Sequence, residues 1–320
     1  MALPIKIGDL LKFGKTLLKA QKQGLRLTIY VDPRADLGLV SEVCELLRPE
    51  TKRSQVFVQV LSGQAGDDAA LIVHDRKTVA RIVLCSCAAD VACLAPFPAP
   101  TCVIAADEIR SVVAQRLGLS ILDTASPLSG DLHKQLATWL SMTLSQRRLT
   151  LAGDFSFTRA VVGGDLCSAT AWQNAVIALA PLTHGADLPV LMGNQIKMVF
   201  QLALADGLKL NAQRVPELAA TGAVALIGRR ISRRLAFRFA PARWLARGVI
   251  AFALTLAWGQ AARLYYDRRA LDAAARTAAL GADDADTDTD APTRFLEAVI
   301  QANPTETLRG LLQSAPASRG

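Results

Sequence analysis

Between residues 25 and 123 the chain alternates short apolar runs with helix-like stretches. A short apolar run bounded by turn residues predicts a buried strand, and an amphipathic segment between two such runs predicts a helix. Strands that alternate with helices indicate a parallel, doubly wound sheet, so we expect an α/β domain of Rossmann-like class. The segment 77–95 stays open, because its centre fits a strand while its length fits a helix. The expected strands are 25–31, 55–61, 69–75, 101–106 and 120–123, and the expected helices are 36–47 and 107–118, the second closed by Gly118.

The loop after the first expected strand lacks the residues that bind phosphate. A phosphate loop belongs at this position, where the carboxyl edge of the sheet meets a helix N-terminus. Residues 31–42 contain no glycine run and no Lys-Ser or Lys-Thr pair, and Asp32 and Asp36 would repel phosphate. The segment Gly8 to Thr16 is one residue too long for a phosphate loop, and no strand precedes it. We therefore expect a degenerate nucleotide-binding-like domain without a bound cofactor.

Other signs of catalysis or metal binding are weak. Asp75 and Asp107 follow later strands, where magnesium-binding and guanine-reading residues stand in GTPases, but an Asp there is also an ordinary turn or cap residue. The three histidines, at 74, 133 and 184, have no paired-ligand spacing, and the cysteines between 85 and 102 match no zinc or iron–sulfur pattern. The acidic run 286–297 lacks the glycine of a calcium loop. We expect no catalytic residue and no metal.

Beyond Gly130 the apolar periodicity predicts helices to about residue 270. The tract 281–293 is acidic and rich in turn residues, which is typical of a linker. The expected organisation is an amphipathic N-terminal helix at 1–24, a degenerate α/β domain at 25–130, a helical domain at 131–270, an acidic linker at 271–293 and short C-terminal helices at 294–320.

Positive charge is concentrated in two apolar parts of the chain. The net charge is +8, yet residues 170–270 alone hold thirteen basic and four acidic side chains, a net charge of +9. Residues 1–24 hold five Lys and one Asp. Cations beside apolar surface attract anionic lipid headgroups. Nucleic acid is the competing polyanion, but no recognition motif supports it, so we expect no nucleic-acid partner.

The segment 240–267 carries the features of a helix at a bilayer. Fifteen residues between Arg247 and Arg263 are uncharged, which is too short for a bilayer span without the aromatic boundaries at Trp244 and at Tyr265 and Tyr266. A membrane hairpin, an in-plane helical layer and a soluble helical bundle with a solvated Arg face all remain open. The residues expected to contact lipid are Arg229, Arg230, Arg233, Arg234, Arg238, Arg243, Trp244, Arg247, Arg263, Tyr265 and Tyr266.

Residues 171–207 resemble the opening of a bacterial domain of unknown function that accompanies small GTPases and GTPase-like proteins, often as a membrane-embedded C-terminal half. The resemblance continues into 240–267 and covers about 100 residues. It implies a membrane-embedded helical domain behind a degenerate GTPase-like domain, and it carries over no catalytic residue. The residues that carry it most clearly are Asn174, Pro181, Asp187, Pro189, Asn194, Gln195 and Gly207.

Taken together, these features predict a non-catalytic scaffold or regulatory protein at the bacterial cytoplasmic membrane, with the α/β domain on the cytoplasmic side. We expect anionic lipid as one partner, with a GTPase or another protein as a second. The alternative function is a nucleotide-binding sensor or hydrolase that uses the carboxyl edge of the sheet near Asp32, Asp75 and Asp107.

Overall fold

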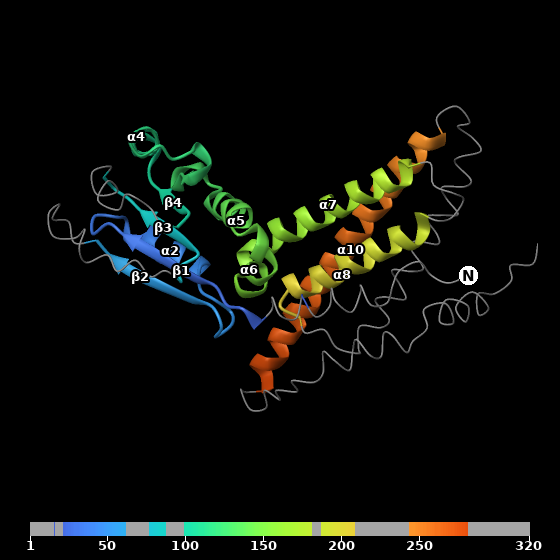
Figure 1. Ribbon diagram of the computed structural model, residues 1–320. Helices are drawn as coiled ribbons and strands as arrows, with labels where there is room; N and C mark the ends of the chain where they lie inside the picture. The colour runs from blue at the N-terminus through green and yellow to red at the C-terminus, as the bar shows by residue number, and fades with distance from the viewer. Residues whose placement is uncertain are drawn as a thin grey trace, which may run out of the picture. The chain divides into compact units, whose positions relative to one another are not determined.

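The computed structural model describes residues 22–61, 77–87, 99–180, 187–208 and 243–280, together with Thr16. The chain divides into two compact units, which are an α/β unit over Ala20–Val162 and a helical unit made of Met1–Lys19 and Gly163–Gly320 (Figure 1). The described helices and strands therefore confirm an α/β part and an all-helical part.

The described strands of the α/β unit form one parallel sheet in the order β2-β1-β3-β4-β5. The order reverses between β1 and β3, which makes this point the topological switch of a doubly wound sheet. The strands are β1 (Arg26–Val31), β2 (Gln55–Val60), β3 (Ala80–Leu84), β4 (Thr101–Ile104) and β5 (Thr124–Ala125).

Helices cover the two faces of this sheet. One face packs against α2 (Leu37–Leu46), α5 (Leu132–Thr143) and α6 (Arg148–Asp154) through the core that contains Leu27, Ile29 and Ile82. The other face packs against α4 (Asp107–Leu117) through Tyr30, Val83 and Val113. β1, β3 and β4 are buried nearly throughout, as expected for central strands of a parallel sheet.

Most of the expected elements in this unit are confirmed. β1, β2, α2, β4 and α4 overlap the expected ranges, and Gly118 closes α4 in the left-handed conformation. In the open segment 77–95, the structure has strand β3 at Ala80–Leu84. The expected strand at 120–123 was wrong, because Ile121–Asp123 is a 3-10 helix and β5 follows it. Asp123 accepts hydrogen bonds from the Ser120 backbone and hydroxyl, which stabilise the turn there.

The α/β unit reaches further along the chain than residue 130. α5 and α6 lie within Ala20–Val162, because their apolar faces complete the core beside the sheet. Leu136, Leu140 and Leu151 are fully buried there. Amphipathic periodicity alone does not say which unit a helix packs against.

The described part of the helical unit consists of three long helices. They are α7 (Arg159–Leu179), which begins a few residues before the unit does, α8 (Asp187–Ala205) and α10 (Arg243–Leu280). α10 continues to Leu280, beyond the expected helix end near residue 270 and into the range assigned to the acidic linker. Most of the expected N-terminal helix and of the linker, the strand at 69–75 and the C-terminal helices lie outside the described residues.

Candidate functional site

Four polar side chains meet where α7, α8 and α10 pack together. Asn174 on α7 donates from Nδ2 to Thr255 Oγ1 on α10 at 3.0 Å, and its Oδ1 accepts from Asn194 Nδ2 on α8 at 3.0 Å. Gln195 Nε2 also donates to Thr255 Oγ1, at 3.3 Å. Asn174, Thr255 and Gln195 are 0%, 1% and 5% exposed. This amide–hydroxyl network therefore joins all three helices inside the unit.

Two buried polar atoms of α8 and α10 have no hydrogen-bond partner among the described residues, and one of them belongs to the network. Gln195 Oε1 and the indole Nε1 of Trp258 are buried and make no hydrogen bond in the part of the chain that the structure describes. A buried polar atom without a partner costs about 1–3 kcal/mol.

Glycines let the helices approach closely on either side of the network. A Cβ on Gly259 of α10 would lie 2.6 Å from Cys167 Sγ of α7 and 3.2 Å from Met198 Sδ of α8. A Cβ on Gly248 would lie 2.7 Å from Leu179 of α7. Close contacts through small residues, together with polar side chains between helices, are typical of membrane helix packing.

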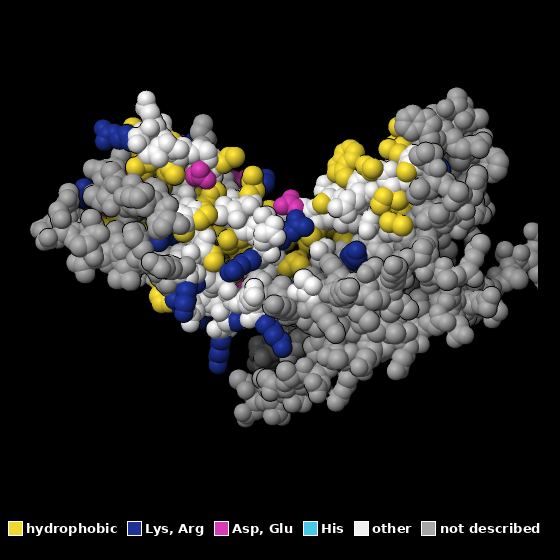
Figure 2. Space-filling view, in the orientation of Figure 1, with side chains coloured by type: hydrophobic (Ala, Val, Ile, Leu, Met, Phe, Trp, Pro, Cys, Tyr) yellow, Lys and Arg dark blue, Asp and Glu magenta, His cyan; other side chains and the backbone are white. Residues whose placement is uncertain are grey.

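Large apolar side chains lie on the outside of the same helices. Trp172 and Val176 of α7 are 62% and 63% exposed, and Val249 of α10 is 60% exposed. Trp172 and Phe252 are in contact, with ring centroids 4.9 Å apart, so the apolar surface is continuous from α7 to α10. Figure 2 shows hydrophobic side chains at the surface over α7. The described helices therefore bury a polar network among apolar side chains and also expose large apolar side chains on α7 and α10.

Within the described residues, one helical segment is long and apolar enough to cross a bilayer. It runs from Leu245 to Arg268, 24 residues, and its most apolar 18-residue window has a mean hydropathy of 1.3. At ~1.5 Å per residue it covers ~36 Å, against a hydrocarbon core of ~30 Å. The core helix of a soluble protein passes the same test but is mostly buried, whereas 22% of the 18-residue window is buried.

The residues expected to contact lipid are only partly described. Tyr265 is 46% exposed, whereas Tyr266 is 1% exposed and belongs to the interior of the helical unit, so of this pair only Tyr265 presents substantial surface. Arg263 lies over α7, where its Nε is 2.8 Å from the place of a Cβ on Gly163, and its Nη1 donates to Gln260 at 3.1 Å. Arg247 lies in α10, and Arg243 and Trp244 begin that helix. Arg229, Arg230, Arg233, Arg234 and Arg238 lie outside the described residues.

Four of the seven residues that carry the family resemblance have a described structural role. Asn174, Asn194 and Gln195 belong to the network, although no interhelical contact between them was expected from the sequence. Gly207 ends α8 with a φ of 71°, and the Gly207 and Leu208 amides bond back to the Leu204 and Ala203 carbonyls, as in a Schellman cap.

The remaining resemblance residues have no described side-chain role. Asp187 and Pro189 lie in the first turn of α8, and Pro181 lies outside the described residues. Thr255, the acceptor at the centre of the network, was missed. The sequence signal for this role is that Thr255 is the one threonine within the uncharged run 248–262.

Asp32 lies at the topological switch point of the sheet, directly after β1. Its Oδ1 accepts from the Arg34 backbone at 2.9 Å, and its Oδ2 accepts from the Ser86 backbone at 3.0 Å. Burial raises the pKa of this carboxyl, but the two amide hydrogen bonds and the Arg34 guanidinium outweigh that effect, so the net pKa lies below the ordinary value of 3.8. The carboxylate therefore joins the β1–α2 loop to the end of β3.

Carboxylates occupy the helix N-termini that a phosphate group would otherwise use. Asp36 caps α2 by accepting from the Leu39 amide at 2.9 Å. Asp107 and Glu108 stand in the first turn of α4. Helix N-termini attract anions through their free amides, so an acidic side chain at that position competes with a phosphate group.

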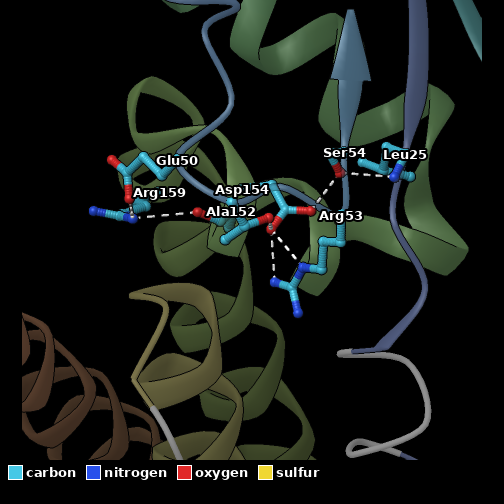
Figure 3. Close-up of polar contacts among 8 residues, drawn as sticks. Leu25, Glu50, Arg53, Ser54, Ala152, Asp154 and Arg159 are labelled. Carbon is cyan, nitrogen blue, oxygen red and sulfur yellow. Dashed lines mark hydrogen bonds and ion pairs between the residues drawn. The ribbon is translucent and has the colours of Figure 1, made fainter. Parts of the chain in front are cut away.

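A second buried carboxylate, that of Asp154, stabilises the other side of the α/β unit (Figure 3). It is 0% exposed and accepts from Thr51 Oγ1 at 2.7 Å, from Arg53 Nε at 2.7 Å and from Ser54 Oγ at 2.5 Å. Ser54 Oγ in turn accepts from the Leu25 amide at 2.7 Å. Glu50 and Arg159 form an ion pair nearby. Because protein donors surround both carboxylate oxygens, the geometry indicates a structural role.

The other candidate metal ligands of the described residues do not form a cluster. In the described ranges, no group of three or more His, Cys, Asp or Glu side chains is placed to hold a metal ion. Cys85 and Cys102 are buried in the two cores of the sheet, and burial raises the pKa of the Cys102 thiol. Cys93, His74 and His184 lie outside the described residues.

Comparison with known proteins returned no match to a family model, to a curated protein or to a solved structure.

Proposed function

We propose that this protein is a non-catalytic scaffold or regulatory protein of the bacterial cytoplasmic membrane. In this proposal the helical unit associates with the bilayer, and the α/β unit serves on the cytoplasmic side as a module that docks a protein partner. Anionic lipid is the first partner, because thirteen of the basic residues lie between 170 and 270.

The observation that carries the membrane part is the combination of a buried polar network with exposed large apolar side chains on α7 and α10. Asn174, Gln195 and Thr255 are buried, whereas Val176 and Val249 are 63% and 60% exposed. In water the exposed apolar surface stays hydrated, which is unfavourable, and the buried amides depend on their mutual hydrogen bonds. In a bilayer the same arrangement is favourable, since the solvent is apolar and polar side chains find partners only in each other.

The non-catalytic part rests on the carboxyl edge of the sheet. Asp32 is held by backbone amides and Arg34, and Asp36 caps the helix that would face a phosphate group. Neither carboxylate is positioned as an open ligand for a magnesium–nucleotide complex. The resemblance of 171–207 to a GTPase-associated domain makes a GTPase the partner class that we propose, with the partner supplying the nucleotide site.

Flotation on vesicles tests the membrane part with a matched control. Full-length protein is expected to float with vesicles that contain anionic lipid and to remain with membranes after a carbonate wash. Changing Val176, Val249 and Leu264, each at least 60% exposed, to Gln is expected to reduce flotation strongly. The same change at Leu37, Leu122 and Met142, which are equally exposed on the α/β unit, leaves it unaltered. Full-length protein that stays monodisperse without detergent and ignores vesicles contradicts the proposal.

A separate titration tests the alternative function. Full-length protein in detergent is titrated calorimetrically with GTP and with ATP in the presence of magnesium. We expect no heat of binding, and binding in the micromolar range favours the nucleotide sensor or hydrolase instead.

A further inference from the structure

β2 stands at one end of the sheet order among the described strands and is unusually exposed for a strand of a parallel sheet. Val58 and Val60 project on one face and are 51% and 67% exposed, and Phe57 projects on the other face and is 43% exposed. Strands of parallel sheets are normally covered on both faces. An exposed apolar edge strand is a template for pairing with a further strand.

The backbone of β2 offers a complete row of hydrogen-bonding groups at this edge. The Gln55 and Leu61 amides donate to the Leu25 and Val31 carbonyls, so the odd-numbered residues of the strand face β1. In a strand the peptide groups alternate in direction, and the amides and carbonyls of Val56, Val58 and Val60 therefore point away from the sheet. No other described strand pairs with them.

The sequence of β2 is suited to pairing with itself. QVFVQV contains no charged residue, so the strand residues of two antiparallel copies meet without like-charge repulsion. The neighbouring Arg26 guanidinium lies over Phe57 and donates to Gln55, on the face opposite to Val58. A twofold axis perpendicular to the sheet places the Val58 faces of both copies on one side of the continued sheet and the Phe57 faces on the other side. With the axis at Val58, that residue lies opposite its own copy and Val56 lies opposite Val60 of the second chain. All three valines of each strand are then paired on one face, whereas a shift of the axis to Phe57 or Gln59 leaves one of them unpaired.

We propose that β2 is a homodimerisation edge, at which two copies of this chain join antiparallel and continue their sheets across a twofold axis at Val58. Val58 belongs to a hydrogen-bonded pair in this register, because its amide and carbonyl both point outward. The Cα atoms of such a pair lie ~5.5 Å apart, which suits a disulfide. The proposal concerns the α/β unit alone and does not depend on membrane association.

Disulfide trapping tests both the interface and its register. Full-length protein carrying Val58→Cys is oxidised mildly in detergent and is expected to form a dimer through a 58–58 linkage, identified by mass spectrometry. Val60→Cys is the matched control, since residue 60 and its copy lie four residues apart along the antiparallel strands, ~13 Å at ~3.3 Å per residue. Wild-type protein controls for the native cysteines. Equal cross-linking of the two variants, or none in either, overturns the proposal.

A charge at the same position provides an independent measurement. Val58→Lys places two ammonium groups opposite each other and is expected to weaken the dimer by about tenfold or more in analytical ultracentrifugation. Val112→Lys on α4 adds the same charge at a 39% exposed site away from the edge and leaves the dimer intact. A wild-type monomer whose β2 amides are protected from hydrogen exchange at every concentration overturns the proposal and points to an occupant within the chain, such as the expected strand 69–75.

Discussion

The carboxylate of Asp154 on α6 accepts a hydrogen bond from Ser54 Oγ at 2.5 Å, although the two residues stand 100 positions apart in the chain. The same carboxylate pairs with Arg53 at 2.6 Å. The turn that leads into β2 is thereby joined to a helix near the end of the α/β unit (Figure 3).

Removing this carboxylate is expected to destabilise the α/β unit. Asp154→Asn removes the buried carboxylate charge that pairs with the Arg53 side chain, which is 24% exposed, and breaking a buried pair on one side costs about 3–5 kcal/mol. The free energy of unfolding from a denaturant titration checks this value. The control is Asp131→Asn, whose ion pair with Lys134 is exposed on both sides and contributes about 0–1 kcal/mol. Similar losses in the two variants contradict the structural role of Asp154.

Asp32 is expected to make the stability depend on pH in acid. Its folded-state pKa lies below 3.8, so its stabilising contribution is complete above the unfolded-state pKa and is lost as the pH falls through the folded-state value. The difference in unfolding free energy between wild type and Asp32→Asn should therefore shrink as the pH is lowered from about 5 to about 2. A difference that stays constant or grows in acid argues against the charged hydrogen bonds to Arg34 and Ser86.

The hydroxyl of Thr255 is expected to stabilise the helical unit. Thr255→Val removes the acceptor of both Asn174 and Gln195 while keeping the side-chain shape, with an expected loss of about 1–2 kcal/mol. Reversible unfolding in detergent or in bilayers measures the loss. Thr255→Ser retains the hydroxyl and should keep most of the stability. Equal losses in the Val and Ser variants point to packing, not to hydrogen bonding.

Two glycines of the helical unit should respond in opposite directions to the same change. Gly259→Ala places a methyl group 2.6 Å from Cys167 Sγ and is expected to destabilise the unit by about 1–3 kcal/mol. Gly164→Ala meets nothing closer than 3.8 Å, and its higher helix propensity should stabilise the unit by up to about 1 kcal/mol. Melting temperatures of the two variants in detergent show whether each change raises or lowers the stability of the unit. A stabilising Gly259→Ala shows that the helices are not in close contact there.

The seven arginines between 229 and 247 are expected to strengthen binding to anionic lipid. Replacing Arg229, Arg230, Arg233, Arg234, Arg238, Arg243 and Arg247 by Gln should weaken binding to anionic vesicles, by roughly 1 kcal/mol for each residue at the surface. Co-sedimentation at low salt measures the effect, and high salt should reduce the difference because ions screen exposed charges. Unchanged binding at low salt contradicts a contribution of these arginines to lipid binding.

The strands and helices of the sheet were largely predictable, since burial of β1 and β4 on both faces produces unbroken apolar runs. The short turn at Ser120 and Asp123 was not, because two local hydrogen bonds to the Asp123 carboxylate favour a 3-10 helix over a strand across three residues. The sequence singled out Asn174, Asn194 and Gln195 without indicating that they meet. Their encounter depends on the packing of three helices, and Thr255 stands 60 positions from Gln195. Similarly, the assignment of α5 and α6 to the sheet core follows from tertiary packing, which periodicity does not encode.

The cap of α2 has a consequence for how the α/β unit behaves in solution. Asp36 supplies a negative charge at the start of the helix from within the chain. A loop that binds a free anion changes its conformation when the anion binds or dissociates. In this loop the Asp36 carboxylate is the anion at the helix N-terminus, and it is part of the chain. We therefore expect the β1–α2 loop to keep one conformation in buffers with and without phosphate, and to act as a constant surface instead of a ligand-driven switch.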